Sequence, residues 1–199
     1  MTADCRPLTI LVTGGLGFIG SNLAPELRKR GHEVWVCDLG HSSESNYIRC
    51  DVSKYRQLER LFDEHDFDYV YHLAAEYGRW NGEKYTVYKG HKRIIDFVED
   101  SCRTWANIID NFIPGEVYNV GSRPEWEMDI KGYSDLILKA VGRDDSIVTY
   151  KESEPFTTRI KTMDFSKAVR DLKHDPEVSP EEGIKRTVEW MKWHYKTGD

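Results

Sequence analysis

The chain has 199 residues and an acidic balance, with 34 Asp and Glu against 28 Lys and Arg, a net charge of −6 and a pI near 5.7. This length allows one full domain with a buried core and is too short for two of ordinary size. Charges of both signs are interspersed, so no basic stripe is available to neutralise a phosphate backbone. We therefore expect no nucleic-acid partner.

The sequence also argues against a membrane partner and a structural metal. No apolar run approaches the roughly 18 residues that a membrane helix needs. The first ten residues lack the charged start and long apolar stretch of a signal peptide, so we expect a cytoplasmic protein. The four cysteines stand apart, without histidines at metal-ligand spacing.

A strand, a glycine turn and a helix are predicted near the N-terminus. Residues 8–12, "LTILV", form a short apolar run that ends in "TGGLGFIG", and "SNLAPELRKR" then has apolar residues at helical spacing. Glycines in the pattern G-x-x-G-x-x-G permit a tight turn and let backbone N–H groups approach a pyrophosphate. The alternative is an ordinary βα turn, because such a turn alone is a weak signal.

An acidic residue follows at the spacing expected for a ribose-binding group. Gly31 is a candidate helix end, and "HEVWVCD" predicts a second strand that closes with Asp38. A carboxylate there accepts hydrogen bonds from ribose hydroxyls and repels a 2′-phosphate. The following "LGHSS" contains no arginine, which favours NAD over NADP. The alternative is that Asp38 only starts a turn.

Two further strands are predicted before residue 76. "YIRCDV" leads to Asp51 and Val52, Ser53 is a candidate cap for the helix "KYRQLERLFDEH", and "FDYVYHLAA" is another β-rich run. Strands and helices alternate, which predicts an α/β fold with a parallel sheet covered on both faces.

Four motifs now carry a family resemblance: "TGGLGFIGSNL", Asp38, "CDV" and "HLAA". In this order and spacing they resemble the N-terminal half of the extended short-chain dehydrogenase/reductases, the NAD-dependent nucleotide-sugar epimerases and dehydratases. The resemblance implies that the glycine turn holds the NAD pyrophosphate and Asp38 the ribose, that Asp51 and Val52 flank the adenine, and that residues 73–75 lie near the nicotinamide. The implied cofactor-binding residues are Gly14, Gly17, Phe18, Ile19, Gly20, Asp38, Asp51, Val52, Leu73, Ala74 and Ala75.

The second half resembles the C-terminal end of the same family. In "HKRIIDFVED", Arg93 matches an arginine that contacts the nucleotide diphosphate in relatives, although a surface arginine is the alternative. "GEVYNVGS" resembles a late strand of the family's sheet, and its Asn119 is a second candidate substrate residue. The resemblance thus implies a nucleotide diphosphate or nucleotide sugar as partner. "MDFSKAVRDLKHDP" has Lys173 where the family usually has glycine.

A last helix is predicted from its cap. Ser179 and Glu182 form a capping box, with Pro180 at the first helical position. The apolar residues that share one face of this helix are expected in the core: Ile184, Val188, Met191 and Tyr195.

The family's central segment, with its catalytic Ser or Thr and Y-x-x-x-K helix, is missing from the chain. Tyr85 and Lys89 have the Y-x-x-x-K spacing. On a helix such residues are neighbours at about 5–6 Å, but "KYTVYK" favours a strand, where four residues span roughly 13 Å. We interpret the match as chance; Tyr85, Lys89 and Tyr77, together with Tyr88, stay candidates for catalysis.

We therefore predict a reduced Rossmann-like parallel sheet of about five strands, flanked by helices, with a small C-terminal helical lobe. Residues 1–83 are expected to form the NAD-binding half, and residues 84–199 the rest of the sheet and a substrate-side lobe. The "DYVYHLAA" strand would need cover, from "VYNVG" or from a second subunit, and we expect a homo-oligomer.

Two functions stay open. The first is an NAD-binding protein without turnover of a sugar. The second is a compact NAD-dependent nucleotide-sugar epimerase or dehydratase with a non-standard tyrosine base.

Overall fold

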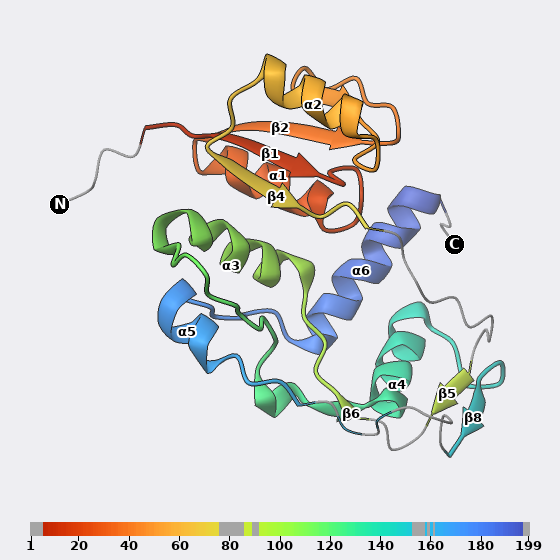
Figure 1. The fold of residues 1–199 in the computed structure, drawn as a ribbon. Coiled ribbons are helices and arrows are strands. Elements are labelled where there is room, and N and C mark those ends of the chain that lie inside the picture. Colours follow the sequence, from red (N-terminus) through yellow and green to blue (C-terminus); the bar gives the residue numbers. More distant parts are fainter. Residues whose placement is uncertain are drawn as a thin grey trace. The chain divides into compact units, whose positions relative to one another are not determined.

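A computed structural model describes residues 6–75, 86–88, 92–152, 158, 160 and 162–196 (Figure 1). The chain divides into two compact units, Met1–Arg79 and Trp80–Asp199.

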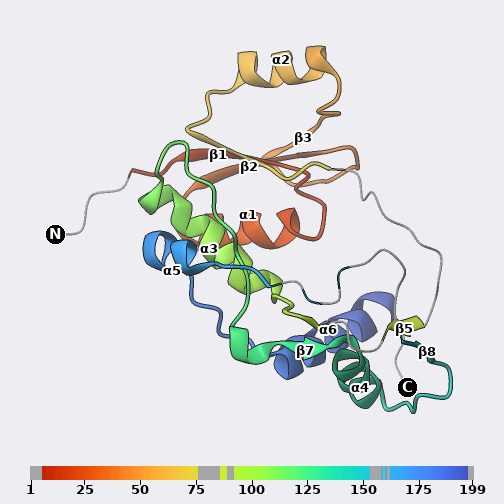
Figure 2. The same ribbon diagram turned by 60° about the horizontal axis from the view of Figure 1, so that its bottom comes forward.

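The first unit is built on a parallel sheet. Its strands are β1 (Thr9–Thr13), β2 (Glu33–Asp38), β3 (Tyr47–Arg49) and β4 (Tyr69–His72), in the order β3-β2-β1-β4. Helix α1 (Gly20–Lys29) covers one face and α2 (Tyr55–Glu64) covers the other (Figure 2). The predicted Rossmann-like parallel sheet is confirmed, with four strands in place of about five.

The core of this unit lies on both sides of β1. Ile10, Leu11 and Val12 are completely buried, and Leu11 forms a cluster with Cys37, Cys50 and Leu61 on the α2 side. Burying one such aliphatic side chain stabilises the fold by about 1.5–3 kcal/mol. The apolar run of β1 is therefore what fixes the position of the glycine turn that follows it.

The predicted cap of α2 is wrong by one residue. Lys54 occupies the N-cap position, and it makes no side-chain cap hydrogen bond. Ser53 instead donates from its hydroxyl (2.7 Å) and its N–H (3.0 Å) to Oδ1 of Asp51. Ser53 therefore belongs to the turn before the helix, in which the Asp51 side chain accepts hydrogen bonds from the residue two positions later.

The second unit combines helices with short strand pairs. Its helices are α3 (Val98–Asn111), the 3₁₀ turn η1 (Pro124–Trp126), α4 (Ile130–Val141), α5 (Ser166–Leu172) and α6 (Pro180–Tyr195). Helix α3 packs on α5, and α4 packs on α6. Strand β5 (Thr86–Tyr88) pairs in parallel with β8 (Thr149–Lys151), and β6 (Lys92–Arg93) pairs antiparallel with β7 (Met128–Asp129).

Helix ends in the second unit follow the sequence closely. Gly142 ends α4 in the left-handed conformation. Ser179 accepts a hydrogen bond from the Glu182 N–H, with Pro180 in the first turn of α6, as the capping box predicted. Lys173, which stands at the usual glycine position, ends α5 with φ +52°, a conformation that glycine adopts without strain.

The strand predicted in "GEVYNVGS" is wrong. Residues 115–122 form no strand, and Val117 is 81% exposed. Lys167 of α5 donates to the Val117 carbonyl (3.1 Å) and to the Glu116 carboxylate, and Asn119 donates to the Asp164 carbonyl (3.1 Å). These bonds to α5 and the residues before it override the strand preference of valine and tyrosine.

The core role predicted for the end of α6 is also wrong. Ile184 and Val188 are half-buried, whereas Met191 is 46% and Tyr195 60% exposed. Pro180 and Gly183 are buried at the start of the helix, and the Gly183 backbone lies against the Phe97 ring. The helix is therefore packed mainly at its start.

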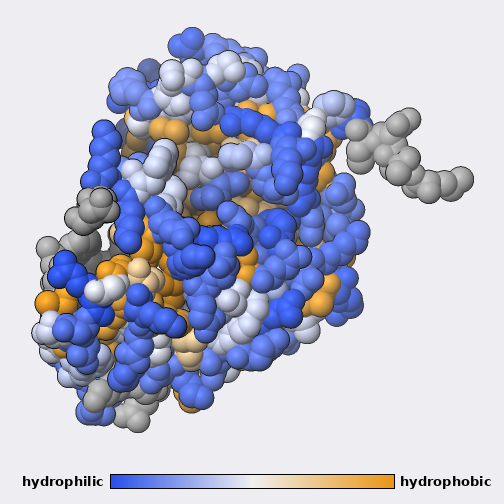
Figure 3. All heavy atoms as spheres, turned by 180° about the vertical axis from the view of Figure 1, so that it is seen from behind, coloured by the Kyte–Doolittle hydropathy of each residue, from blue (hydrophilic) through white to orange (hydrophobic). Residues whose placement is uncertain are grey.

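The surface as a whole agrees with the mean hydropathy of −0.63. Figure 3 shows one face on which hydrophilic residues predominate and smaller hydrophobic areas lie between them. No helix among the described residues is long and apolar enough to cross a membrane.

Candidate cofactor-binding site

The turn between β1 and α1 can form only because its glycines lack side chains. A Cβ at Gly14, where φ is +68°, would lie 2.8 Å from the Ala74 nitrogen. A Cβ at Gly20 would lie 2.4 Å from the Gly14 oxygen, and one at Gly15 would lie 2.1 Å from Cγ1 of Val36. The turn thus packs directly on the residues after β4 and opens its backbone toward solvent. Gly15 was not among the predicted residues, although "TGG" contains it.

Asp38 is fixed at the carboxyl end of β2 by two backbone donors. Its Oδ2 accepts from the Leu16 N–H (3.0 Å) and its Oδ1 from the Leu39 N–H (2.7 Å). A carboxylate offers about four lone-pair positions. The remaining two can accept ribose hydroxyls, so the carboxylate is both oriented and able to bind.

Asp51 and Val52 close the adjacent side of the site. The Asp51 N–H donates to Oε1 of Gln57 (2.8 Å), and Val52 packs against the buried cluster around Leu11. Hydrogen bonds from Ser53 lower the pKa of the Asp51 carboxyl, and Lys54 lowers it further. The negative charge of the Asp51 carboxylate is therefore stabilised by the two residues that follow in the same turn, Ser53 and Lys54.

The ends of β1 and β4 are joined through one buried hydroxyl. Oγ1 of Thr13 lies 2.8 Å from Nδ1 of His72 and accepts from the N–H groups of Leu73 (3.2 Å) and Ala74 (3.3 Å). This bond set holds the segment that packs against Gly14. Thr13 was not among the predicted residues, although its place in the sequence is a signal: it is a hydroxyl residue that closes an apolar strand directly before the turn.

These parts surround a cleft of about 660 Å³, within the range of cofactor and ligand sites. Of the predicted residues, three turn residues are not in the lining: Phe18, which is 71% exposed, Ile19 and Gly20. Six lining residues were not predicted, and all but Gly40 adjoin a predicted residue: Leu16, Cys37, Leu39, Gly40, Cys50 and Ser53. Among the described residues, the lining is Gly14, Leu16, Gly17, Cys37, Asp38, Leu39, Gly40, Cys50, Asp51, Val52, Ser53, Leu73, Ala74 and Ala75.

Thiol and metal chemistry find no support in the cleft. Burial raises the pKa of the Cys37 thiol to about 12, with smaller contributions from Cys50 and Asp38. Burial also raises the pKa of Cys50. Both thiols are therefore protonated at neutral pH. Within the described ranges, no group of three or more His, Cys, Asp or Glu residues is placed to hold a metal ion.

The catalytic candidates Tyr77, Tyr85 and Lys89 lie outside the described residues. The three residues between Tyr85 and Lys89 form β5, which is the strand that the composition predicted.

A second Y-x-x-x-K spacing, Tyr88 and Lys92, escaped the sequence analysis. Tyr88 ends β5 and Lys92 begins β6, and these strands pair with different partners. Nζ of Lys92 lies 3.2 Å from Oε1 of Glu127 in an ion pair. The two ends of this spacing thus lie on strands.

The two candidate substrate residues lie in the second unit, each bound to backbone. Arg93 on β6 donates to the Lys92 carbonyl (2.7 Å) and the Thr158 carbonyl (3.2 Å). Asn119 donates to the Asp164 carbonyl. Both side chains thus have structural contacts beside any role in ligand binding.

The second unit also contains a buried polar cluster on α3. Asp100 accepts from Arg103 (2.5 Å) and from the Val178 N–H (3.0 Å), and His174 lies 2.7 Å from Oγ1 of Thr104. Nearby, Oδ1 of Asp96 is buried without a hydrogen-bond partner among the described residues. Burial raises the pKa of Asp96 to about 6, while His174 lowers it and Asp100 raises it. The cluster ties α3 to the segment before α6.

Comparison with known sequences supports the cleft's assignment. Residues 10–100 match the sequence model described as "NAD dependent epimerase/dehydratase family". The chain is 33% identical over 143 residues to UDP-N-acetyl-alpha-D-glucosaminuronate decarboxylase of Bacillus cytotoxicus, covering 62% of this chain and 41% of that protein. It is 30% identical over 108 residues to dTDP-glucose 4,6-dehydratase of Actinoplanes sp., covering 53% and 33%. The chain thus spans well under half the length of these relatives.

Solved structures share the fold. UDP-glucose 4-epimerase of Thermotoga maritima, solved with UDP-glucose, aligns with a TM-score of 0.79 and 20% identity, over 94% of this chain and 100% of that one. dTDP-glucose 4,6-dehydratase of Bacillus anthracis, solved with NAD, aligns with a TM-score of 0.78 and 16% identity, over 95% and 98%. The motifs and the four-stranded parallel sheet agree with this match, and residues 10–100 of the chain are similar to the NAD-dependent epimerase/dehydratase family.

Proposed function

We propose that the chain binds NAD in the cleft of its first unit and does not by itself turn over a nucleotide sugar. The observation that carries the first part is Asp38, held by the Leu16 and Leu39 N–H groups with acceptor positions left for a ribose. The glycine turn fits the pyrophosphate, because its backbone is exposed and an added Cβ would collide with the protein's own backbone. The cofactor, when bound, supplies a hydride acceptor.

The second part of the proposal rests on the missing acid–base pair. General acid–base catalysis needs a group within hydrogen-bond reach of the proton it moves. Support comes from β5, because residues 86–88 between Tyr85 and Lys89 form a strand, whereas the family's pair lies on a helix. The relatives' names favour the alternative of a compact enzyme acting on a nucleotide sugar.

Calorimetric titration tests cofactor binding. We expect NAD to bind more tightly than NADP, since a carboxylate at the ribose repels a 2′-phosphate. Asp38→Asn is expected to weaken NAD about tenfold or more, because a hydrogen bond to a charged group contributes about 1.5–3 kcal/mol. The exposed Asp63→Asn on α2 is the matched control and should leave binding unchanged. Absence of NAD binding to the unaltered chain would overturn the proposal.

Turnover is tested separately, with UDP-glucose and dTDP-glucose as substrates in the presence of NAD. We expect no epimerised or dehydrated product above the buffer control. Product formation that disappears in Tyr85→Phe or Tyr88→Phe would establish the compact-enzyme alternative and identify its base.

Recognition of a nucleotide diphosphate is a further part of the proposal, supported by Arg93 on β6. UDP titration of the unaltered chain and of Arg93→Gln measures it. We expect UDP to bind and the variant to weaken it, because arginine pairs readily with phosphate oxygens. Sedimentation analysis of the same samples tests the expected homo-oligomer.

A further inference from the structure

Two buried oxygens of the second unit have no hydrogen-bond partner and belong to residues that line the same small cavity. Among the described residues, Oδ1 of Asp96 and Oγ of Ser122 are the buried side-chain polar atoms without a partner, and we call them the cavity oxygens. Ser122 is 1% exposed. The cavity has a volume of about 40 Å³, and its lining is Ile94, Asp96, Gly121, Ser122, Met163 and Phe165. Unsatisfied buried polar atoms are rare in folded proteins, so two at one cavity indicate a shared partner.

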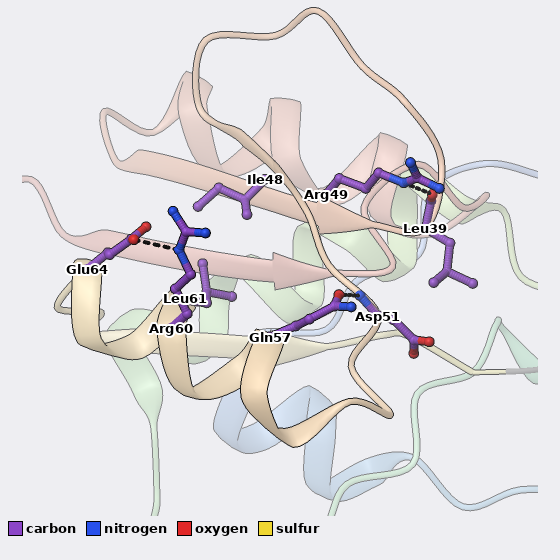
Figure 4. A pocket seen from close by; sticks show the side chains of 8 residues that line it. All are labelled: Leu39, Ile48, Arg49, Asp51, Gln57, Arg60, Leu61 and Glu64. Atoms are coloured by element: carbon purple, nitrogen blue, oxygen red, sulfur yellow. Dashed lines mark hydrogen bonds and ion pairs between the residues drawn. The ribbon is translucent and has the colours of Figure 1, made fainter.

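The pocket beside α2 shows the contrast, because polar groups in its lining pair with each other. In Figure 4, Gln57 lies beside Asp51, whose N–H donates to Oε1 of Gln57 (2.8 Å), and Arg60 lies beside Glu64, with Nε and Oε1 2.7 Å apart. The Arg60 and Glu64 side chains are also exposed to solvent. The cavity oxygens, by comparison, are removed from solvent without a partner in any described residue.

The volume of the cavity limits what can serve as the shared partner. A water molecule needs about 10–15 Å³ of such space, whereas ordinary ligand pockets measure about 300–1,000 Å³. A nucleotide or a sugar is therefore excluded. A buried water forms hydrogen bonds to about two to four polar groups. The cavity supplies a carboxylate oxygen, which accepts, and a hydroxyl, which donates and accepts, so water matches it in size and in chemistry.

The walls of the cavity are held in place by other contacts. Because a carbonyl can only accept, Nε2 of His174 donates to the Gly121 carbonyl, directly before Ser122. Nδ1 of the buried His174 ring lies 2.7 Å from Oγ1 of Thr104. The Phe165 ring packs edge-on against His174, with 5.6 Å between the ring centroids, and a Cβ at Gly121 would lie 3.1 Å from Cδ1 of Phe165. The protein's own packing therefore forms the cavity before anything binds in it.

We propose that this cavity is a hydration site that binds one water molecule between Oδ1 of Asp96 and Oγ of Ser122. The water donates one hydrogen to the Asp96 carboxylate and forms a second hydrogen bond with the Ser122 hydroxyl. It thereby joins the segment before α3 to the segment before η1. Every residue of the site belongs to the second unit, so the site stands or falls separately from the proposed NAD binding.

A donor in the cavity also acts on the charge of Asp96. Burial raises the pKa of this carboxyl to about 6, while His174, which follows α5, lowers it and Asp100 of α3 raises it. Tyr133 of α4 interacts with Asp96 electrostatically as well. A hydrogen bond from a bound water favours the carboxylate over the protonated acid, and it therefore acts against the effect of burial.

Two measurements on the full chain test the site. Magnetic relaxation dispersion of water counts long-lived internal waters, and carboxyl ¹³C NMR follows the titration of Asp96. Ser122→Val removes the hydroxyl and adds a methyl group to the cavity. We expect one long-lived water fewer and a pKa of Asp96 higher by about 1 or more, since a hydrogen bond to a charged group is lost. Thr162→Val, the same change of hydroxyl to methyl at an exposed residue beside Met163, is the matched control and should change neither.

A crystal structure of the unaltered chain makes the test independent of whether the variant folds. We expect a water within about 3.2 Å of both cavity oxygens. A direct Asp96–Ser122 hydrogen bond, or equal numbers of long-lived waters in the unaltered chain and Ser122→Val, would overturn the site. A titration of Asp96 that differs between ammonium chloride and choline chloride at one ionic strength would show a monovalent cation in the cavity and overturn the assignment to water.

Discussion

Replacing Thr13 by valine should weaken both the fold and the cofactor cleft. The side chain is 2% exposed, and its hydroxyl accepts from the Leu73 and Ala74 N–H groups while facing Nδ1 of His72. Two N–H donors occupy its lone pairs, so the hydroxyl hydrogen points to Nδ1, which accepts it. Valine keeps the shape of the side chain and removes all three bonds.

The size of the effect follows from which groups lose their partner. The Leu73 N–H retains the Thr13 carbonyl at 3.2 Å, so the Ala74 N–H and the His72 ring carry the loss. His72 is exposed and Ala74 is only partly buried, so both groups can turn to water, and the loss is close to the net contribution of a hydrogen bond, about 0.5–1.5 kcal/mol. We expect Thr13→Val to lower the free energy of unfolding by about 1 kcal/mol, and NAD affinity to fall because Ala74 lines the cleft.

Urea unfolding followed by fluorescence measures the stability, and calorimetry at a temperature where the variant is folded measures NAD binding. Thr13→Ser is the matched control, because it keeps the hydroxyl and loses only a methyl group. If Thr13→Val were as stable as the unaltered chain and bound NAD equally well, the hydroxyl would not be what joins β1 to β4.

Three further changes have outcomes fixed by local geometry. Gly20→Ala places a Cβ 2.4 Å from the Gly14 oxygen, so titration should detect no NAD binding and the free energy of unfolding should fall by about 1–3 kcal/mol. The exposed Lys29→Ala on the same helix is the control and should change neither quantity. Lys173→Gly should raise the free energy of unfolding by about 0.5–1 kcal/mol, and with it the urea midpoint, because glycine adopts the positive φ of this position without strain. An unchanged midpoint would contradict this. Asp96, with its pKa raised to about 6, keeps a proton that the unfolded chain releases above about pH 4, so its stabilising contribution is present at low pH and is lost as pH rises through 6. In urea unfolding measured across this pH range, Asp96→Asn should remove about 1–2 kcal/mol of that pH dependence. If the free energy of unfolding of the variant changed with pH as that of the unaltered chain does, this prediction would be wrong.

The first unit could be predicted well because its signals are local. An apolar strand, a glycine turn and an acidic strand end each act within a few residues, and the structure places them as expected: β1 at Thr9–Thr13, α1 from Gly20, and Asp38 closing β2. Parallel strands then bring their carboxyl ends to one edge of the sheet. Eight of the predicted cofactor residues line a single cleft for this reason.

What escaped prediction depends on contacts between distant residues. The Thr13 hydroxyl meets residues about sixty positions later, and Arg49 meets Leu39 only because β2 and β3 share a register. In residues 115–122 a local signal is overridden by distant contacts. "VYNVG" has strand composition, but its hydrogen bonds are made with Lys167 and Asp164 and not with a neighbouring strand. Local propensity carries no information about which partner is present.

Cofactor binding and catalysis are physically separable in this chain. Every described residue that lines the cleft lies between Gly14 and Ala75. The bonds that orient Asp38 and the segment after β4 come from the same range. The groups that shape the cleft therefore depend on no described residue beyond Ala75, so we expect dinucleotide binding to be independent of whether the chain carries a catalytic Tyr–Lys pair.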